Sequence, residues 1–373
     1  MRPRVRDTGI IVGRMEPGPH NGITDVAGVR VGHATLISGE GPLRPGSGPV
    51  RTGVTVILPH GESLFRHKVR AAVHTINGFG KVFGFEQVRE LGQIESPIAL
   101  TNTLNVGLVA DALISHAIER DPDIGISTAG TVNVVVGETN DGYLNDIQGR
   151  HVRADHVQAA IASAAAGPVA EGAVGAGTGT ICFGWKGGIG TASRLVPEEA
   201  GGYTVGALVQ SNFGRAADLQ VCGAPVGREI QPPPRRRATQ RNLPVPAQKE
   251  GSIMIVLATD SPLDARQLGR LCVRVGAGLA RTGSQYGHGS GDFVIAFSTA
   301  GPVAQARSAA KVLQPMVADE GKAMYWLFPA VVECVEEAVL NSLFRAETMT
   351  GRDGHTIEAL PVERVVAICQ GAQ

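Results

Sequence analysis

The sequence feature that most constrains this chain is the junction Gly251-Ser252, where a stretch without hydrophobic periodicity meets a strand-like run. The six residues that follow, Ile253 to Ala258, are all apolar, which is typical of a buried strand. A serine at the start of such a strand, behind a glycine and a linker, suits a hydrolase that cuts its own chain. Taken by itself, however, the pair also fits an ordinary linker end.

In the self-cleaving interpretation, the hydroxyl of Ser252 attacks the carbonyl of Gly251, and an ester forms before the chain separates. The new N-terminal serine then supplies both the nucleophile and, through its freed α-amine, the base. Glycine fits the position before the cut because it tolerates strained backbone and leaves the carbonyl open.

The composition indicates a globular protein without an obvious charged partner. The chain has 373 residues, is 43% hydrophobic and carries no formal net charge, so it can bury a core but gives no reason to expect nucleic acid or an anionic membrane as a partner. Five scattered cysteines without CxxC spacing argue against a disulfide framework and against a zinc site. The start lacks an apolar signal region and no stretch reaches membrane-spanning length, so we expect a cytoplasmic location.

Hydrophobic patterns predict a mixed succession of strands and helices with buried faces, which favours a layered sandwich of both. Strands are expected at 52–59, 132–136, 172–194 (two strands joined at 186–188), 203–210, 253–258 and 293–297. Helices are expected at 104–120, at 156–165, after a cap at Ser261-Pro262, and at 329–347. Residues 222–250 lack periodicity and are predicted to form an exposed loop.

A hydroxyl and a carboxylate stand close together just before the strand at 293–297. Ser290 and Asp292 lie in a glycine-rich loop that can aim side chains into a cleft. The carboxylate would polarise the hydroxyl, which would relay to Ser252; the alternative is a turn in which Asp292 caps local amides. A Ser-His-Asp triad through His288 is disfavoured, because no GxSxG motif is present and His288 is only two residues from Ser290.

Three further polar residues follow predicted strands. Asn212 at a strand end suits an oxyanion donor, although asparagine turns are common there. Glu138 and Tyr143 flank a polar turn, where the carboxylate would hold a substrate ammonium and the phenol would donate to an oxyanion. The alternative for this pair is a solvated hairpin tip. The glycine-rich segments near 175–190 match neither phosphate-loop motif.

Several separated segments together resemble one family, the L-aminopeptidase D-Ala-esterase/amidase (DmpA-like) serine peptidases, which include the β-peptidyl aminopeptidases. The resemblance covers essentially the full length and rests on the segments NGITDV (21–26), VRVGH (29–33), TNTLNVG (101–107), GETND (137–141), Gly251-Ser252 with its strand, EEAVLN (336–341) and GRDG (351–354).

The resemblance implies an α+β fold, a four-layer αββα sandwich that is like the N-terminal nucleophile (Ntn) hydrolases but differs in connectivity. It also implies a single domain, 1–373, that cuts itself into an α chain (1–251) and a β chain (252–373) and assembles as a homotetramer. Such enzymes remove N-terminal residues from short peptides, amides or esters, and they need no cofactor or metal.

The same resemblance assigns roles to individual residues. Ser252 matches the nucleophile, Ser290 and Asp292 match its supporting pair, and Asn212 matches the oxyanion donor. Tyr143 matches the active-site tyrosine, and Glu138 matches the carboxylate that binds the substrate ammonium. Some relatives have glutamate where this chain has Asp292, so the reach of that carboxylate is one methylene shorter here.

Two other functions remain open at this point. One is an acyltransferase of the ornithine acetyltransferase type, although those enzymes use threonine where this chain has Ser252. The other is an uncleaved binding protein of the same fold. The residues also leave open the preference for α- or β-amino acids, for L or D residues, and for amides or esters.

Overall fold

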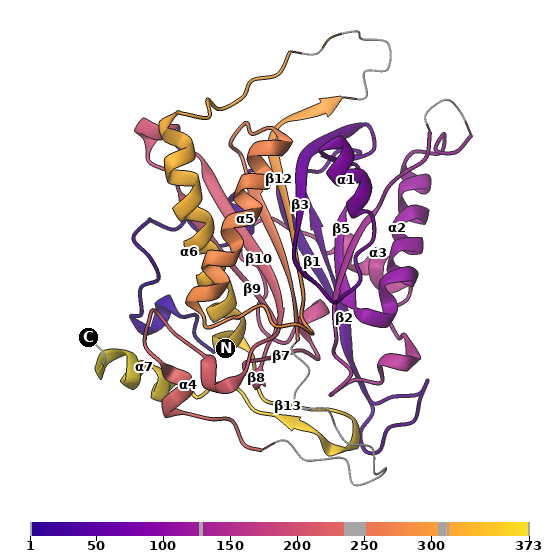
Figure 1. The fold of residues 1–373 in the computed structure, drawn as a ribbon. Coiled ribbons are helices and arrows are strands. Elements are labelled where there is room, and N and C mark those ends of the chain that lie inside the picture. The colour runs from indigo at the N-terminus through magenta and orange to yellow at the C-terminus, as the bar shows by residue number, and fades with distance from the viewer. Residues whose placement is uncertain (1, 127–129, 235–250, 305–310, 312, 372–373) are drawn as a thin grey trace.

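The computed structural model describes residues 2–126, 130–234, 251–304, 311 and 313–371. Two packed β-sheets form the middle of the molecule, and helices cover both outer faces (Figure 1). Helices α5 and α6 pack on the larger sheet, and α2 and α3 pack on the smaller one. The expected four-layer αββα sandwich is therefore confirmed.

The smaller sheet has the strand order β1-β2-β5-β6 and the larger has the order β4-β3-β12-β11-β10-β9. Two additional pairs, β7-β8 and β13-β14, lie outside these sheets. The strands are β1 (Arg30–Ser38), β2 (Val50–Leu58), β3 (His67–Gly78), β4 (Gln93–Ile94), β5 (Ile98–Asn102), β6 (Val135–Thr139), β7 (Ile181–Cys182), β8 (Trp185–Lys186), β9 (Ile189–Leu195), β10 (Thr204–Asn212), β11 (Ser252–Thr259), β12 (Gly291–Ala304), β13 (Met349–Thr350) and β14 (Thr356–Ile357). The α-helices are α1 (Phe85–Leu91), α2 (Val106–Arg120), α3 (Ala154–Ala162), α4 (Val226–Glu229), α5 (Ala265–Arg281), α6 (Lys322–Arg345) and α7 (Val362–Gly371).

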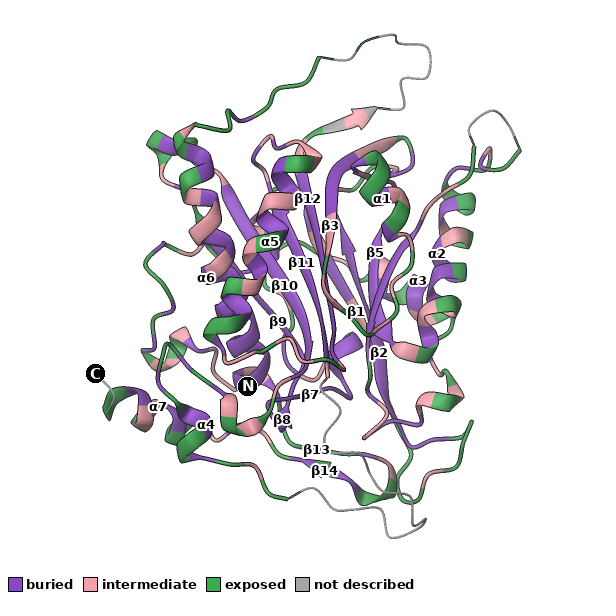
Figure 2. Cartoon of the chain, in the orientation of Figure 1, coloured by how far each residue is buried: buried purple, intermediate pink, exposed green. Residues whose placement is uncertain are grey.

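Strand β11 lies in the centre of the larger sheet and is buried on both faces, as Figure 2 shows. It pairs antiparallel with β10 and parallel with β12. Side chains of a strand alternate between the two faces of a sheet. Ile253 and Ile255 accordingly join the core beneath α5 and α6, whereas Met254 and Val256 join the core between the sheets. Burial on both faces explains why the sequence of β11 is uninterruptedly apolar.

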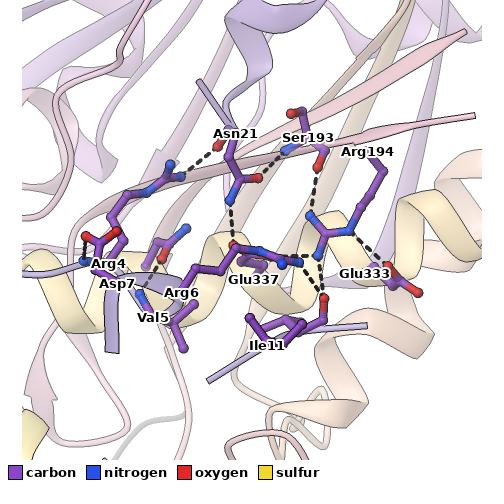
Figure 3. A network of polar contacts seen from close by, with 12 residues as sticks. Arg4, Val5, Arg6, Asp7, Ile11, Asn21, Ser193, Arg194, Glu333 and Glu337 are labelled. Carbon is purple, nitrogen blue, oxygen red and sulfur yellow. Dashed lines mark hydrogen bonds and ion pairs between the residues drawn. The ribbon is translucent and has the colours of Figure 1, made fainter. Parts of the chain in front are cut away.

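The N-terminal arm is tied to helix α6 by a buried network of ion pairs (Figure 3). Arg194 of β9 contacts Glu333 at 2.9 Å and Glu337 at 2.6 Å. Glu337 also accepts from Arg6 at 2.8 Å and from the Asn21 amide at 2.6 Å. Each buried charge therefore has partners of opposite sign, which is the condition for keeping charges away from water. The network joins residues before position 251 to residues after it.

The prediction of an exposed loop over 222–250 is wrong for residues 226–230. Residues Val226–Glu229 form helix α4, and the side chains of Val226 and Ile230 are buried. These two apolar side chains join the core beneath α5 and α6, so tertiary packing overrides the local proline and glycine signals. Residues 231–234 have no helix or strand and are mostly exposed, as predicted, and residues 235–250 lie outside the described part of the chain.

The predicted helix cap at Ser261-Pro262 is also wrong. Helix α5 begins at Ala265, and its N-cap is Asp264, whose carboxylate accepts from the Gln267 backbone at 2.6 Å. In return, the Asp264 backbone N–H donates to the side-chain oxygen of Gln267 at 3.1 Å. Asp264 and Gln267 thus form a reciprocal capping box, whereas the Ser261 hydroxyl has no hydrogen-bond partner among the described residues. Among the helices described, none is long and apolar enough to cross a lipid bilayer.

Candidate active site

Ser252 is the first residue of β11, and its two neighbours in the sheet are Asn212 of β10 and Gly291 of β12. Ser252 and Met254 are two residues apart on the strand, so their side chains lie on the same face of the sheet. Because Met254 is part of the core between the sheets, the Ser252 side chain also points toward the smaller sheet. The sheet therefore places the predicted nucleophile at the end of the inter-sheet layer, next to the predicted oxyanion asparagine.

A cavity of about 340 Å³ opens at this end of the sheets. Five predicted site residues line it together, namely Glu138, Tyr143, Asn212, Gly251 and Ser252. The rest of its wall had no signal in the sequence pattern and consists of Phe79, Lys81, Thr103, Asn140, Ile181, Phe213, Gly214 and Gly289. Segments that are remote in sequence thus converge on one concave site, which is the usual form of a small-molecule binding site.

Glu138 is buried at the end of β6, with only 3% of its surface exposed. One carboxylate oxygen accepts from the Lys81 backbone N–H at 2.9 Å, and the other accepts from the Thr103 hydroxyl. Burial raises the pKa of Glu138, while these donors oppose the rise. A buried carboxylate with fixed orientation on a cavity wall is suited to pair with a cation. The alternative of a solvated hairpin tip is excluded by this burial.

Asn212 is held in one orientation by the neighbouring backbone. Its side-chain oxygen accepts from the Ile181 N–H at 2.9 Å. The amide nitrogen is then the end of the side chain that can donate to an oxyanion in the cavity.

Tyr143 is positioned by a histidine from the far end of the chain. Its ring stacks on His355 with 4.3 Å between ring centroids, and His355 Nδ1 lies 2.9 Å from the Tyr143 carbonyl oxygen. His355 itself is buried. The GRDG segment at 351–354 precedes this histidine directly, but sequence alone gives no signal that His355 supports Tyr143.

Gly251 fits its place only because it lacks a side chain. A Cβ atom at this position would lie 1.6 Å from the carbonyl oxygen of Asn212, far inside contact distance. The Gly251 carbonyl accepts from the Gly291 N–H at 3.3 Å. The peptide between Gly251 and Ser252 is therefore held tightly between strands β10 and β12.

Ser290 and Asp292 form a pair, but on the other side of this peptide. The Ser290 hydroxyl donates to Asp292 at 2.6 Å, and both residues are almost fully buried. Ser290 lines a smaller cavity with Gly251 and Tyr286, and Gly251 lines both cavities. The Gly251–Ser252 peptide thus separates the main cavity from the Ser290–Asp292 pair.

Two buried ionisable groups, which the sequence analysis did not single out, lie behind the wall of the main cavity. Asp141 accepts from the side chains of Thr52 and Asn145, and burial raises its pKa to about 7. The Lys186 ammonium donates to the carbonyls of Gly177 and Gly187, at 3.1 Å and 2.7 Å. Burial lowers the pKa of Lys186 to about 7, although the Asp141 charge opposes this change. These groups fix the turn that carries Tyr143 and the glycine-rich segment before Ile181.

His288 does not take the place of a triad base in this geometry. Its ring is exposed and packs beside Phe79, with 6.4 Å between the ring centroids. The carbonyl oxygen of His288, rather than its ring, takes part in the local hydrogen bonds by accepting from Asn77 at 3.2 Å. This arrangement agrees with the expectation that His288 is not the base of a Ser-His-Asp triad.

Comparison with known proteins identifies the family. The model for peptidase family S58 matches residues 21–357. The β-peptidyl aminopeptidase BapA of Sphingosinicella microcystinivorans is 44% identical over 98% of this chain and 91% of its own.

Two solved structures superpose over the whole chain. One is a protein of Pyrococcus horikoshii OT3, with a TM-score of 0.90 and 47% identity over 100% of this chain and 99% of its own. The other is the L-aminopeptidase D-Ala-esterase/amidase of Ochrobactrum anthropi, described as a prototype of the serine aminopeptidases and a new variant of the Ntn-hydrolase fold. It has a TM-score of 0.87 and 39% identity over 100% of this chain and 99% of its own. The chain therefore belongs to peptidase family S58 and is a serine aminopeptidase with a variant of the Ntn-hydrolase fold.

Proposed function

We propose that this protein matures by cutting itself between Gly251 and Ser252, and that the mature enzyme uses Ser252 to release N-terminal residues from short peptides, amides or esters. The observation that carries the proposal is the position of Ser252. It begins a central strand beside Asn212, in a cavity that also contains the buried carboxylate of Glu138. The names of the β-peptidyl aminopeptidase and L-aminopeptidase relatives support a substrate with a free N-terminus.

In the proposed reaction, Glu138 binds the substrate ammonium and so places the first carbonyl next to Ser252. The Ser252 Oγ attacks this carbonyl carbon while its proton moves to the free α-amine of the same residue. Asn212 donates to the oxyanion, and Tyr143 lies on the same wall to assist. The C–N or C–O bond to the leaving group then breaks, the proton passes to that group, and water hydrolyses the acyl-serine ester.

The Ser290–Asp292 pair is assigned to the α-amine in this scheme. Ser290 lines a cavity with Gly251, on the side of the peptide bond that would be cut. After cleavage, the nitrogen of Ser252 would face that space, where the Ser290 hydroxyl and the Asp292 carboxylate can hold its proton in place. In this scheme, the pair would orient the α-amine of Ser252 for proton transfer and would not contact the Ser252 hydroxyl.

The same proposal extends to assembly and location. The segments 1–251 and 252–373 would stay together, because β11 and β12 lie between β3 and β10 in one sheet and because Glu337 is joined to Arg194 and Arg6. The resemblance to this family supports a homotetramer of such units in the cytoplasm, and sedimentation velocity of the mature enzyme measures the assembly.

Substitution of Ser252 tests the proposal. Ser252→Ala should remain one uncut chain without aminopeptidase activity, whereas Ser252→Cys retains a nucleophile and should process at a measurable rate. Processing is followed on denaturing gels, and hydrolysis is followed with aminoacyl amides. Two fragments and normal hydrolysis in Ser252→Ala would contradict the assignment of the nucleophile.

A further inference from the structure

The main cavity has two charged side chains in its lining, and they differ in sign. Glu138 is buried, and Lys81 is exposed at the surface of the same cavity. The other lining residues in the described part of the chain are polar, aromatic, aliphatic or glycine. A cavity with one negative and one positive side chain is suited to a ligand that carries both charges.

Lys81 lies on a segment that connects the two sheets beside the cavity. This segment follows Gly78, which pairs with Gly291, and leads to Phe83, which forms a bridge with Val136 of β6. The backbone of Lys81 is fixed, because its N–H donates to Glu138. Within the described residues, no ion pair joins the Lys81 ammonium to a carboxylate; its charge acts on Glu138 through space and lowers the pKa of that carboxyl.

A short peptide has the length to span these two cavity-lining residues. The Lys81 backbone nitrogen is 2.9 Å from the Glu138 carboxylate, and the flexible four-carbon stem of lysine lets the ammonium meet a ligand group several ångströms from this point. In a free dipeptide, the ammonium and the carboxylate are separated by two residues of chain, about 7 Å when extended. A dipeptide bound to Glu138 by its ammonium can therefore reach the lysine with its carboxylate.

We propose that Lys81 binds a carboxylate on the leaving side of the scissile bond, so that the enzyme prefers free dipeptides, or peptides with an acidic second residue, over neutral amides. This inference rests on the proposed function, because it uses Glu138 as the site of the substrate ammonium and Ser252 as the nucleophile. It goes beyond that function in naming the substrate class. Lys81 would determine specificity and takes no part in bond breaking.

The test compares matched substrates that differ only in the carboxylate. Alanyl-glycine is compared with alanyl-glycinamide, and alanyl-glutamic acid amide with alanyl-glutamine amide, with a β-alanyl series in parallel. The measured quantity is the ratio of kcat/KM for the acid to kcat/KM for its amide. We expect a ratio of roughly five in the wild-type enzyme, the size of a partly exposed ion pair, and a smaller ratio at high salt.

Three variants assign this preference to the lysine. Lys81→Met should bring the ratio close to one, and Lys81→Arg should restore most of the preference because it keeps the charge. Lys322→Met is the matched control, since it removes an exposed lysine at the start of α6, and its ratio should equal that of the wild type. The first substrate pair detects a terminal carboxylate and the second detects an acidic side chain.

The outcomes separate this inference from the proposed function. If the wild-type enzyme hydrolyses acid and amide equally well, or if Lys81→Met keeps the wild-type ratio, the role of Lys81 is overturned and the aminopeptidase function stands. If the processed enzyme hydrolyses none of these substrates, the proposed function fails, and the specificity inference fails with it.

Discussion

Replacement of Glu138 by glutamine separates recognition of the substrate ammonium from the chemistry of Ser252. The buried side chain is held by the Lys81 N–H at 2.9 Å and by the Thr103 hydroxyl. Glutamine has nearly the same shape and retains an oxygen for the Lys81 N–H, so the wall of the cavity should keep its form. The change therefore removes the negative charge and little else.

The size of the effect follows from the burial of this carboxylate. Removing one partner of a buried, hydrogen-bonded charge pair costs about 2–5 kcal/mol. Because the cavity is open to solvent on one side, we take the lower part of this range, about 2–3 kcal/mol. This corresponds to a fall of roughly 30- to 150-fold in kcat/KM for substrates with a free amine. Self-cleavage should continue at the wild-type rate, because Gly251 in the uncut chain carries no ammonium.

Two assays on the same preparation check this prediction. Denaturing gels follow the appearance of the two fragments, and steady-state hydrolysis of dipeptides gives kcat/KM. Glu363→Gln, an exposed position in the first turn of α7, is the matched control and should behave as the wild type. If Glu138→Gln hydrolyses dipeptides within threefold of the wild-type rate, Glu138 does not bind the ammonium. If it fails to mature, the residue acts in folding or cleavage instead.

Three other predictions concern pH, maturation and stability. Burial raises the pKa of Glu138 above its ordinary value of 4.5, so kcat/KM should decline as the pH falls through that raised pKa, and this acid limb should be absent from the pH profile of Glu138→Gln. Gly251→Ala should slow maturation at least tenfold on a gel time course, because the new Cβ would lie 1.6 Å from the Asn212 carbonyl oxygen. Self-cleavage of this variant at the wild-type rate would contradict the geometry of the junction. Lys186→Met leaves Asp141 buried without the nearby positive charge and should lower the free energy of unfolding in urea by about 3 kcal/mol. The double variant Lys186→Met/Asp141→Asn should recover part of this loss. An equal loss in the single and the double variant would show that the two groups are not coupled.

The sequence predicted the part of the site that depends on local pattern. The apolar run after Ser252 indicated a buried strand, and its first residue is where the cavity lies. Asn212, at the end of the preceding strand, is the direct partner of Ser252 in the sheet. Such neighbours can be expected from sequence because the limits of an apolar run mark the ends of a strand, and two consecutive strands that pair antiparallel place the end of the first beside the start of the second.

Other parts of the site depend on tertiary contacts and have no local signal. Phe79 and Lys81 reach the cavity because β3 lies beside β12, and the sequence of β3, with its histidines, lysine and arginine, does not show the simple alternation of a half-buried strand. His355 meets Tyr143 only in the folded chain. Lys186 was expected to mark a turn between strands; the structure buries it because two backbone carbonyls satisfy its ammonium.

The start of helix α6 also could not be predicted from local sequence. Its predicted start at Pro329 is wrong, since the helix begins at Lys322 and contains the proline. Proline removes one hydrogen bond within a helix and normally ends it. Here Leu327 and Val331, two residues before and after the proline, are buried in the core. This packing outweighs the tendency of proline to end a helix.

The measurement that most directly tests the central claim is the intact mass and N-terminal sequence of the active enzyme. We expect two polypeptides, 1–251 and 252–373, the second beginning with serine at position 252. Activity should increase in step with the amount of this second polypeptide. A single chain of 38.8 kDa with full aminopeptidase activity would contradict it.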